Sequence, residues 1–136
     1  MATRTPFTTA TQIVNTIAVD GHIAQGNPPN YANISYDIND QQYLGSTMSR
    51  QGYNVWWENY EGIYSKMAQA GQKFDFVIEA SSTSDLRNQI SQISQLAAAN
   101  PGAVAIIEGP NEINNFPITY NGVGGLPGAI NPHISH

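Results

Sequence analysis

The segment KFDFVIEASSTSDLRNQISQISQLAAANPGAVAIIEGPNE, residues 73–112, contains two apolar runs with a helical pattern between them. Residues 73–80 contain the apolar residues Phe74, Phe76, Val77 and Ile78 and predict a strand that ends at Glu79. Ser82 begins an S-x-x-D capping box, and the helix that follows it is ended by Asn100-Pro101-Gly102. The continuous apolar run within residues 103–112 predicts a second strand. A strand, a helix and a strand of this length form a crossover connection between parallel neighbours.

The same alternation extends toward the N-terminus. The expected elements are a strand at 13–22, a helix at 31–45, a short strand at 46–51 and a helix at 55–71. The order β-α-β-α-β-α-β predicts an α/β fold with parallel strands covered on both faces, which is either a doubly wound sheet or the first half of a TIM (β/α)8 barrel. A full barrel needs about 250 residues. We therefore expect residues 1–136 to form one partial domain, in which residues 113–136 are mostly loop.

Composition excludes several classes of function. Only 11% of the residues are charged, against about 25% in an average soluble domain, and the net charge is −5. The five basic residues form no cluster that would neutralise phosphates, so we expect no nucleic-acid partner. No apolar run approaches the roughly 18 residues of a membrane span, so we expect no membrane partner. With no cysteine, thiolate nucleophiles and cysteine-based zinc sites are excluded.

Cofactor and targeting motifs are not found in the sequence. There is no P-loop, no dinucleotide fingerprint, no G-x-S-x-G and no H-E-x-x-H, and His133 and His136 have no carboxylate beside them. We therefore expect no cofactor and no metal. The N-terminal residues are polar and contain no apolar core of a secretion signal, so localisation stays open, with an extracellular location among the options.

The stretch IIEGPNEINNFPITYNG, residues 106–122, carries the most informative polar residues. An apolar strand there delivers Glu108, Asn111 and Glu112 to the carboxyl end of the sheet, where active sites of parallel sheets lie. A sheltered carboxylic acid at that end can protonate a leaving oxygen, and an amide suits a sugar hydroxyl. The simpler interpretation is that Glu112 begins a short helix and Glu108 is a solvated charge.

The E-G-P-N-E run after a fourth expected strand resembles the strand-four signature of clan A glycoside hydrolases, which are retaining (β/α)8 barrels. Residues 31–52 resemble the first helix and second strand of a bacterial branch of that clan, and the resemblance covers about residues 13–122. It implies that Glu112 is the general acid/base and that Asn111 contacts the hydroxyl next to the anomeric centre. Clan members attack the sugar directly with a second carboxylate about 5 Å from the first.

The resemblance also implies roles for two earlier residues. Arg50, at the end of the second strand, matches an arginine that steadies the catalytic carboxylates, and His22 lies where the first strand opens into the site. The ordinary alternatives are that Arg50 pairs with Glu58 or Asp37 and that His22 is a packed strand-end histidine. Four aromatic residues at helical spacing fit core packing better than sugar stacking: Trp56, Trp57, Tyr60 and Tyr64.

One departure from the clan pattern limits the expected activity. The nucleophile of the clan ends strand seven, and this chain has no strand seven, so it lacks the second catalytic carboxylate. The expected function is therefore that of a carbohydrate-active protein acting on an oligo- or polysaccharide. The alternative is a non-catalytic carbohydrate-binding protein or a truncated structural half-barrel. Because a half-barrel leaves two strand edges unpaired, we also expect self-association through those edges.

Overall fold

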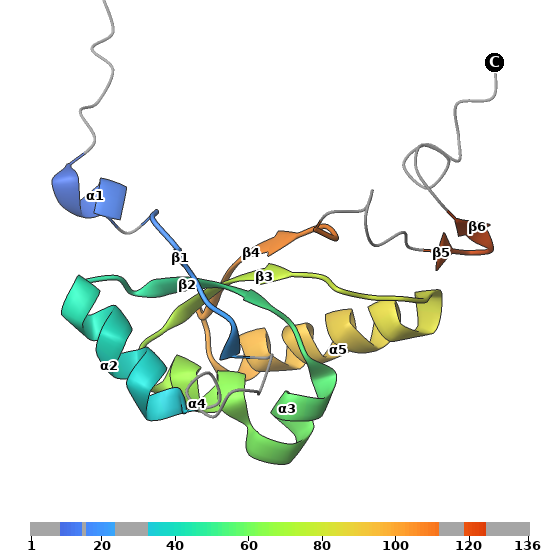
Figure 1. Cartoon of the computed structure of the whole chain (residues 1–136), viewed down its shortest axis with the longest axis horizontal. Coiled ribbons are helices and arrows are strands. Elements are labelled where there is room, and N and C mark those ends of the chain that lie inside the picture. Colours follow the sequence, from blue (N-terminus) through green and yellow to red (C-terminus); the bar gives the residue numbers. More distant parts are fainter. Residues whose placement is uncertain (1–8, 15, 24–32, 112–118, 125–136) are drawn as a thin grey trace, which may run out of the picture.

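The computed structural model describes residues 9–14, 16–23, 33–111 and 119–124, and it is built on a four-stranded parallel sheet (Figure 1). The strands lie in the chain order β1-β2-β3-β4, and each is parallel to the next. Their bounds are β1 Val19–Asp20, β2 Met48–Gly52, β3 Lys73–Val77 and β4 Val104–Glu108. The main helices are α2 Ile34–Leu44, α3 Val55–Glu61, α4 Ile63–Gln69 and α5 Thr83–Ala99. The predicted α/β fold with helices between parallel strands is confirmed.

The chain before the sheet differs from the prediction. Residues 13–22 were expected to form one strand, but Ala10–Val14 form the short helix α1, and only Val19–Asp20 pair in the sheet. The reason is a capping box, because the Thr9 hydroxyl accepts the Gln12 N–H at 3.2 Å and the Gln12 side chain accepts the Thr9 N–H at 2.7 Å. Thr16 then ends the helix, since its N–H and its hydroxyl both donate to the Ile13 carbonyl.

The helix expected at residues 55–71 is divided by Gly62 into α3 and α4. Gly62 has a φ of 59°, in the left-handed region that favours glycine, and its N–H donates to the Glu58 carbonyl. The Glu58 carboxylate then accepts the Tyr64 N–H at 2.8 Å and contacts the Ser65 hydroxyl, which caps the first turn of α4. The break therefore replaces one long helix by two capped ones.

The core lies between the sheet and the helices on one of its faces. Helices α2, α3, α4 and α5 lie on the same side of the sheet (Figure 1). An aromatic cluster fills this side, with Tyr53 stacked on Tyr64 at 4.9 Å between ring centroids and Phe74 stacked on Phe76 at 4.8 Å. The expectation of a sheet covered on both faces is not met by the described residues. We call the uncovered side, which carries Asp20, Arg50, Asp75, Ile106 and Glu108, the open face.

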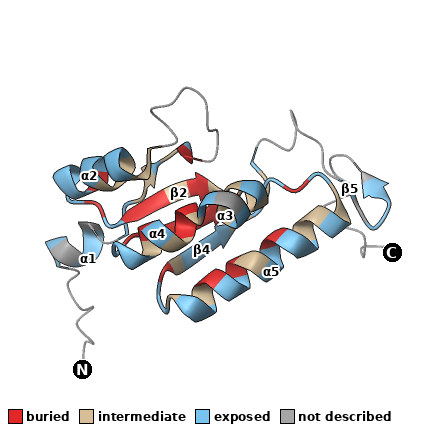
Figure 2. Cartoon of the chain, turned by 90° about the horizontal axis from the view of Figure 1, so that it is seen from below, coloured by how far each residue is buried: buried red, intermediate tan, exposed pale blue. Residues whose placement is uncertain are grey.

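Strand β4 forms one edge of the sheet and is its most exposed strand (Figure 2). Ile106 and Ile107 keep 45% and 48% of their surface exposed, although they point to opposite faces. A β-bulge lies between β3 and β4, because Phe74 pairs with Val104 but Asp75 pairs with Ile106. Ala105 is the extra residue, and it shifts the alternation of side chains in the rest of β4.

The tail expected to be loop contains a short hairpin. Strands β5 (Thr119–Tyr120) and β6 (Val123–Gly124) pair antiparallel, and the turn holds Asn121 and Gly122 at φ values of 50° and 79°. This is the positive-φ Asn-Gly turn that hairpins favour. The Asn121 N–H also donates to the Thr83 hydroxyl at 2.9 Å, which ties the hairpin to the start of α5.

Candidate functional site

The open face carries a row of charged side chains that crosses all four strands. Asp20 of β1, Arg50 of β2 and Asp75 of β3 are in register with one another, so they project from neighbouring positions on the same face. Glu108 is the last residue of β4 and is paired with Val77. We call Asp20, Arg50, Asp75 and Glu108 the charged row.

Arg50 holds this row together. Its Nε donates to both carboxylate oxygens of Glu108 at 3.1 and 3.2 Å, and its Nη2 donates to Oε2 at 2.7 Å. Its Nη1 lies 3.5 Å from the Asp20 carboxylate. The side chain therefore reaches from β2 over β3 to β4. The alternative pairing of Arg50 with Glu58 or Asp37 is wrong, and Arg50 lies in the middle of β2 rather than at its end.

The charges in the row shift the pKa values of its members in opposite directions. The hydrogen bonds from Arg50 lower the pKa of Glu108, and the same bonds raise the pKa of Arg50. Burial raises the pKa of Asp75, and a hydrogen bond between its carboxyl group and that of Glu108 raises it further. Glu108 is therefore a stable anion, whereas Asp75 holds its proton more tightly than an exposed aspartate.

Asp75 is the buried member of the row. It is 7% exposed, and within the described part of the chain its Oδ1 has no hydrogen-bond partner. The sequence reasoning missed it, although the pattern F-D-F places an acid on the face opposite the two phenylalanines of a strand. Asp20 was missed as well, and its signal was its position directly before Gly21 and His22 at the end of the first strand.

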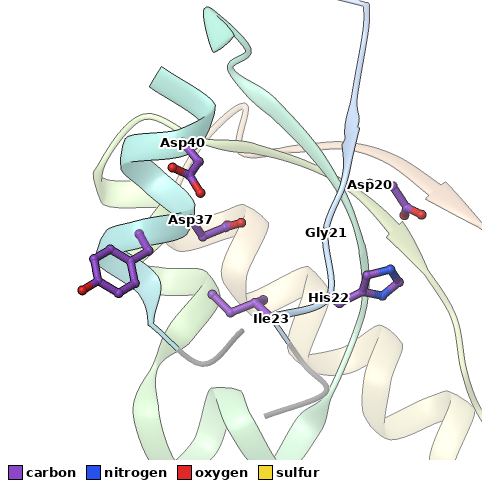
Figure 3. A pocket seen from close by; sticks show the side chains of 7 residues that line it. Asp20, Gly21, His22, Ile23, Asp37 and Asp40 are labelled. Carbon is purple, nitrogen blue, oxygen red and sulfur yellow. The ribbon is translucent and has the colours of Figure 1, made fainter. Parts of the chain in front are cut away.

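His22 follows β1 and is exposed. Figure 3 shows its ring on the same side of β1 as the Asp20 carboxylate, pointing away from α2. A pocket of about 530 Å³ lies between residues 20–23, which include Asp20 and His22, and α2, and the Asp37 side chain points toward residues 20–23 (Figure 3). Burial raises the pKa of Asp37, while a hydrogen bond from Gln41 opposes the rise. Asp37 and Asp40 share this helix face through their spacing of three.

The carboxyl ends of β3 and β4 supply further polar groups. Gly52 is the last residue of β2, and the Glu79 carboxyl group lies against it. A Cβ atom added to residue 52 would lie only 2.8 Å from the Glu79 carboxyl carbon, so the absence of a side chain there leaves room for Glu79. Asn111 is exposed in a turn three residues beyond β4. Glu112, the expected general acid/base, lies outside the described residues. The structure therefore brings Arg50 to Glu108 and Asp20, and it leaves the assignment of Glu112 untested.

The core packing expected for the aromatic residues of α3 and α4 is confirmed for two of them and is wrong for Trp56. Tyr64 is fully buried, and Trp57 is partly buried against the core, whereas Trp56 is exposed. The Tyr64 hydroxyl donates to the Gly52 carbonyl at 2.7 Å, so it holds the end of β2 from the side of the sheet that the helices cover. Burial raises the pKa of Tyr64. The side chain of Tyr60 lies outside the described residues.

Comparison with protein-family models, with curated proteins and with solved structures found no match to this chain. Within the described ranges, no helix combines the length and the apolar character that crossing a membrane requires. The same ranges contain no group of three or more His, Cys, Asp or Glu side chains arranged to bind a metal ion.

Proposed function

We propose that the chain is a carbohydrate-active protein of the retaining O-glycoside hydrolase type, and that its sheet is the first half of a TIM (β/α)8 barrel. The strand order β1-β2-β3-β4 supports this proposal, because a doubly wound sheet reverses its order at a switch point. The helices on one face support it as well, since barrel helices cover only the outer side of the strands. The open face then corresponds to the interior of the barrel.

The observation that carries the proposal is the pairing of Arg50 with Glu108 and Asp20 toward the carboxyl end of the sheet. It fixes the end of β4, from which Asn111 and Glu112 follow within four residues. In the proposed reaction Glu112 protonates the glycosidic oxygen, and Asn111 hydrogen-bonds the hydroxyl beside the anomeric carbon. Arg50 acts as a positioning residue, and His22 contacts the sugar from β1. No residue of this sequence is assigned as the nucleophile, whose attack on the anomeric carbon breaks the bond to the protonated oxygen.

Hydrolysis of a panel of aryl glycosides by the protein as isolated from its native source, where the nucleophile is supplied, tests the proposal. Glu112→Gln should lower turnover by about 100-fold or more, since general acid catalysis contributes 10²–10⁴-fold. Glu61→Gln is the matched control, because Glu61 is an exposed glutamate at the end of α3 and should leave turnover unchanged. Equal turnover in both variants would show that Glu112 is not the acid/base.

One observation favours a second candidate function, non-catalytic carbohydrate binding. Glu108 is bound by Arg50 and has a lowered pKa, so it is a poor proton donor and is better suited to accept hydroxyl groups. Calorimetry with oligosaccharides distinguishes the two functions. Binding that His22→Ala weakens, together with no hydrolysis of any glycoside, would favour the second candidate. If no saccharide binds and none is hydrolysed, both proposals are wrong.

A further inference from the structure

We infer that the edge strand β4 and the adjoining open face form an interaction surface for a polypeptide strand that places a Lys or Arg side chain over Asp75 and Glu108. The inference does not rest on the proposed action on carbohydrates. The residue of the charged row on which the inference depends is Asp75, and the proposed reaction gives Asp75 no role.

Strand β4 is an unprotected edge of the sheet. In the part of the chain that the structure describes, no strand pairs with its outer side. Its middle residues Ala105, Ile106 and Ile107 are exposed and apolar, and its one charge, Glu108, lies at the end. Natural edge strands are usually protected by charges, proline or a covering segment. An edge of this composition favours the addition of another strand.

The charged row has more negative than positive charge. Three carboxylates share the single guanidinium of Arg50, whose Nε and Nη2 donate to Glu108 and whose Nη1 lies 3.5 Å from Asp20. Asp75 interacts with the carboxyl group of Glu108 and with the charge of Arg50, but its buried Oδ1 has no hydrogen-bond partner among the described residues. A buried oxygen of this kind requires a donor. A cationic side chain would provide both the donor and the missing charge.

Arg50 shows that a long basic side chain can reach across a neighbouring strand of this face. Its side chain starts on β2, passes over β3 and reaches Glu108 on β4. The span is two strand spacings, or roughly 9.6 Å. A long basic side chain on a strand beside β4 would cover the same span in the opposite direction, over β4 to Asp75 on β3. Glu108 would lie directly in its path.

Charge excludes a second copy of this chain as the best occupant. A second open face would bring another three carboxylates and one arginine that is already paired. Of the other described basic residues, Lys66 is on α4 and Arg87 is on α5, away from that face. Lys73 shares the face of Asp75 by the alternation of β3, but it lies at the amino end of the strand, away from Glu108. A strand from a different polypeptide, with a basic residue, therefore fits the surface better.

Short strand peptides test the inference directly. The probe is a fluorescein-labelled nine-residue peptide of alternating Val and Thr with one central Lys, and its matched partners carry Glu or Met at that position. In anisotropy titrations against the whole chain, the Lys peptide should bind about tenfold more tightly than the Glu peptide, and the preference should fall at high salt. Equal affinities, or no binding of any peptide at millimolar concentration, would overturn the inference.

Two variants identify the residues responsible. Asp75→Asn should reduce the preference for Lys to less than about threefold, whereas Asp40→Asn, which makes the same change on the exposed part of α2, should leave it intact. Ile106→Lys should weaken all three peptides, because it places a charge on the edge. A preference that survives Asp75→Asn would refute the assignment. Dimers of the chain that the Lys peptide does not dissociate would identify a second copy as the occupant instead.

Discussion

Replacement of Arg50 by Met should destabilise the fold by about 2 kcal/mol at pH 7. Loss of one partner of a buried ion pair costs about 3–5 kcal/mol, and an exposed pair contributes about 0–1 kcal/mol. The side chains of Arg50 and Glu108 are 29% and 36% exposed, so this pair lies between those limits. Met preserves much of the aliphatic length of the arginine, so the change isolates the guanidinium. It also leaves three carboxylates without a cation across neighbouring strands.

The pH dependence provides the sharper part of this prediction. Because Arg50 lowers the pKa of Glu108 in the folded state, the pair contributes stability above the unfolded pKa of about 4.3, and this stability is lost as the pH falls through the lowered pKa. The difference in unfolding free energy between the native chain and Arg50→Met should therefore be largest near neutral pH. It should approach zero in strong acid.

Urea unfolding followed by tryptophan fluorescence at several pH values measures both effects. Arg87→Met is the matched control, because Arg87 is exposed on α5 and its loss should change stability by less than about 0.5 kcal/mol. A double-mutant cycle with Glu108→Gln isolates the pair itself. If Arg50→Met costs no more than Arg87→Met, or if its cost does not change with pH, the ion pair between Arg50 and Glu108 does not stabilise the sheet.

Three further substitutions test separate features. Asp75→Asn should raise the unfolding free energy by about 1 kcal/mol at pH 7 but not at pH 3. Because the pKa of Asp75 is raised in the folded state, the aspartate contributes stability below its unfolded pKa and loses it as the pH rises through its folded pKa. Urea unfolding at the two pH values checks this. Gly21→Ala should cost about 1–3 kcal/mol, since its Cβ would lie 1.9 Å from the buried Gln51 Nε2, whereas Gly109→Ala, with open space at its Cβ, should be nearly neutral in the same assay. Asn54→Ala should lower the thermal unfolding midpoint by removing about 1 kcal/mol of helix capping at α3, and an unchanged midpoint would show that this cap is dispensable.

Local patterns in the sequence predicted most of the fold. The S-x-x-D box and Asn100-Pro101-Gly102 bracket α5, and the apolar runs mark β3 and β4, because each of these signals acts within a few residues. The prediction of a strand at residues 13–22 was wrong because another local signal lies directly before this segment. The Thr9–Gln12 capping box is a local signal too, and it outweighed the β-branched residues that follow it.

The candidate site was less predictable, because it depends on contacts between distant strands. Arg50 is 58 residues from Glu108, so no local pattern indicates which carboxylate it pairs with. The orientation of Asp75 could be inferred from F-D-F, but its burial depends on the neighbouring strands. Glu112 stays a prediction from the E-G-P-N-E resemblance.

The extra residue in β4 determines which side of the sheet receives the Glu108 carboxylate. Counting from the pairing of Phe74 with Val104, an unbroken register would place Glu108 beside Ile78, whose side chain packs in the hydrophobic core. The bulge at Ala105 delays the alternation by one position and turns Glu108 toward Arg50 instead. Deleting Ala105 would remove the bulge and leave Ile106 opposite Asp75 and Glu108 opposite Val77, so Glu108 would still face Arg50. A strand that kept Ala105 but paired without the bulge would instead turn Glu108 toward the core. The bulge, and no residue of the site itself, thus allows a β4 of this length to present Glu108 to Arg50.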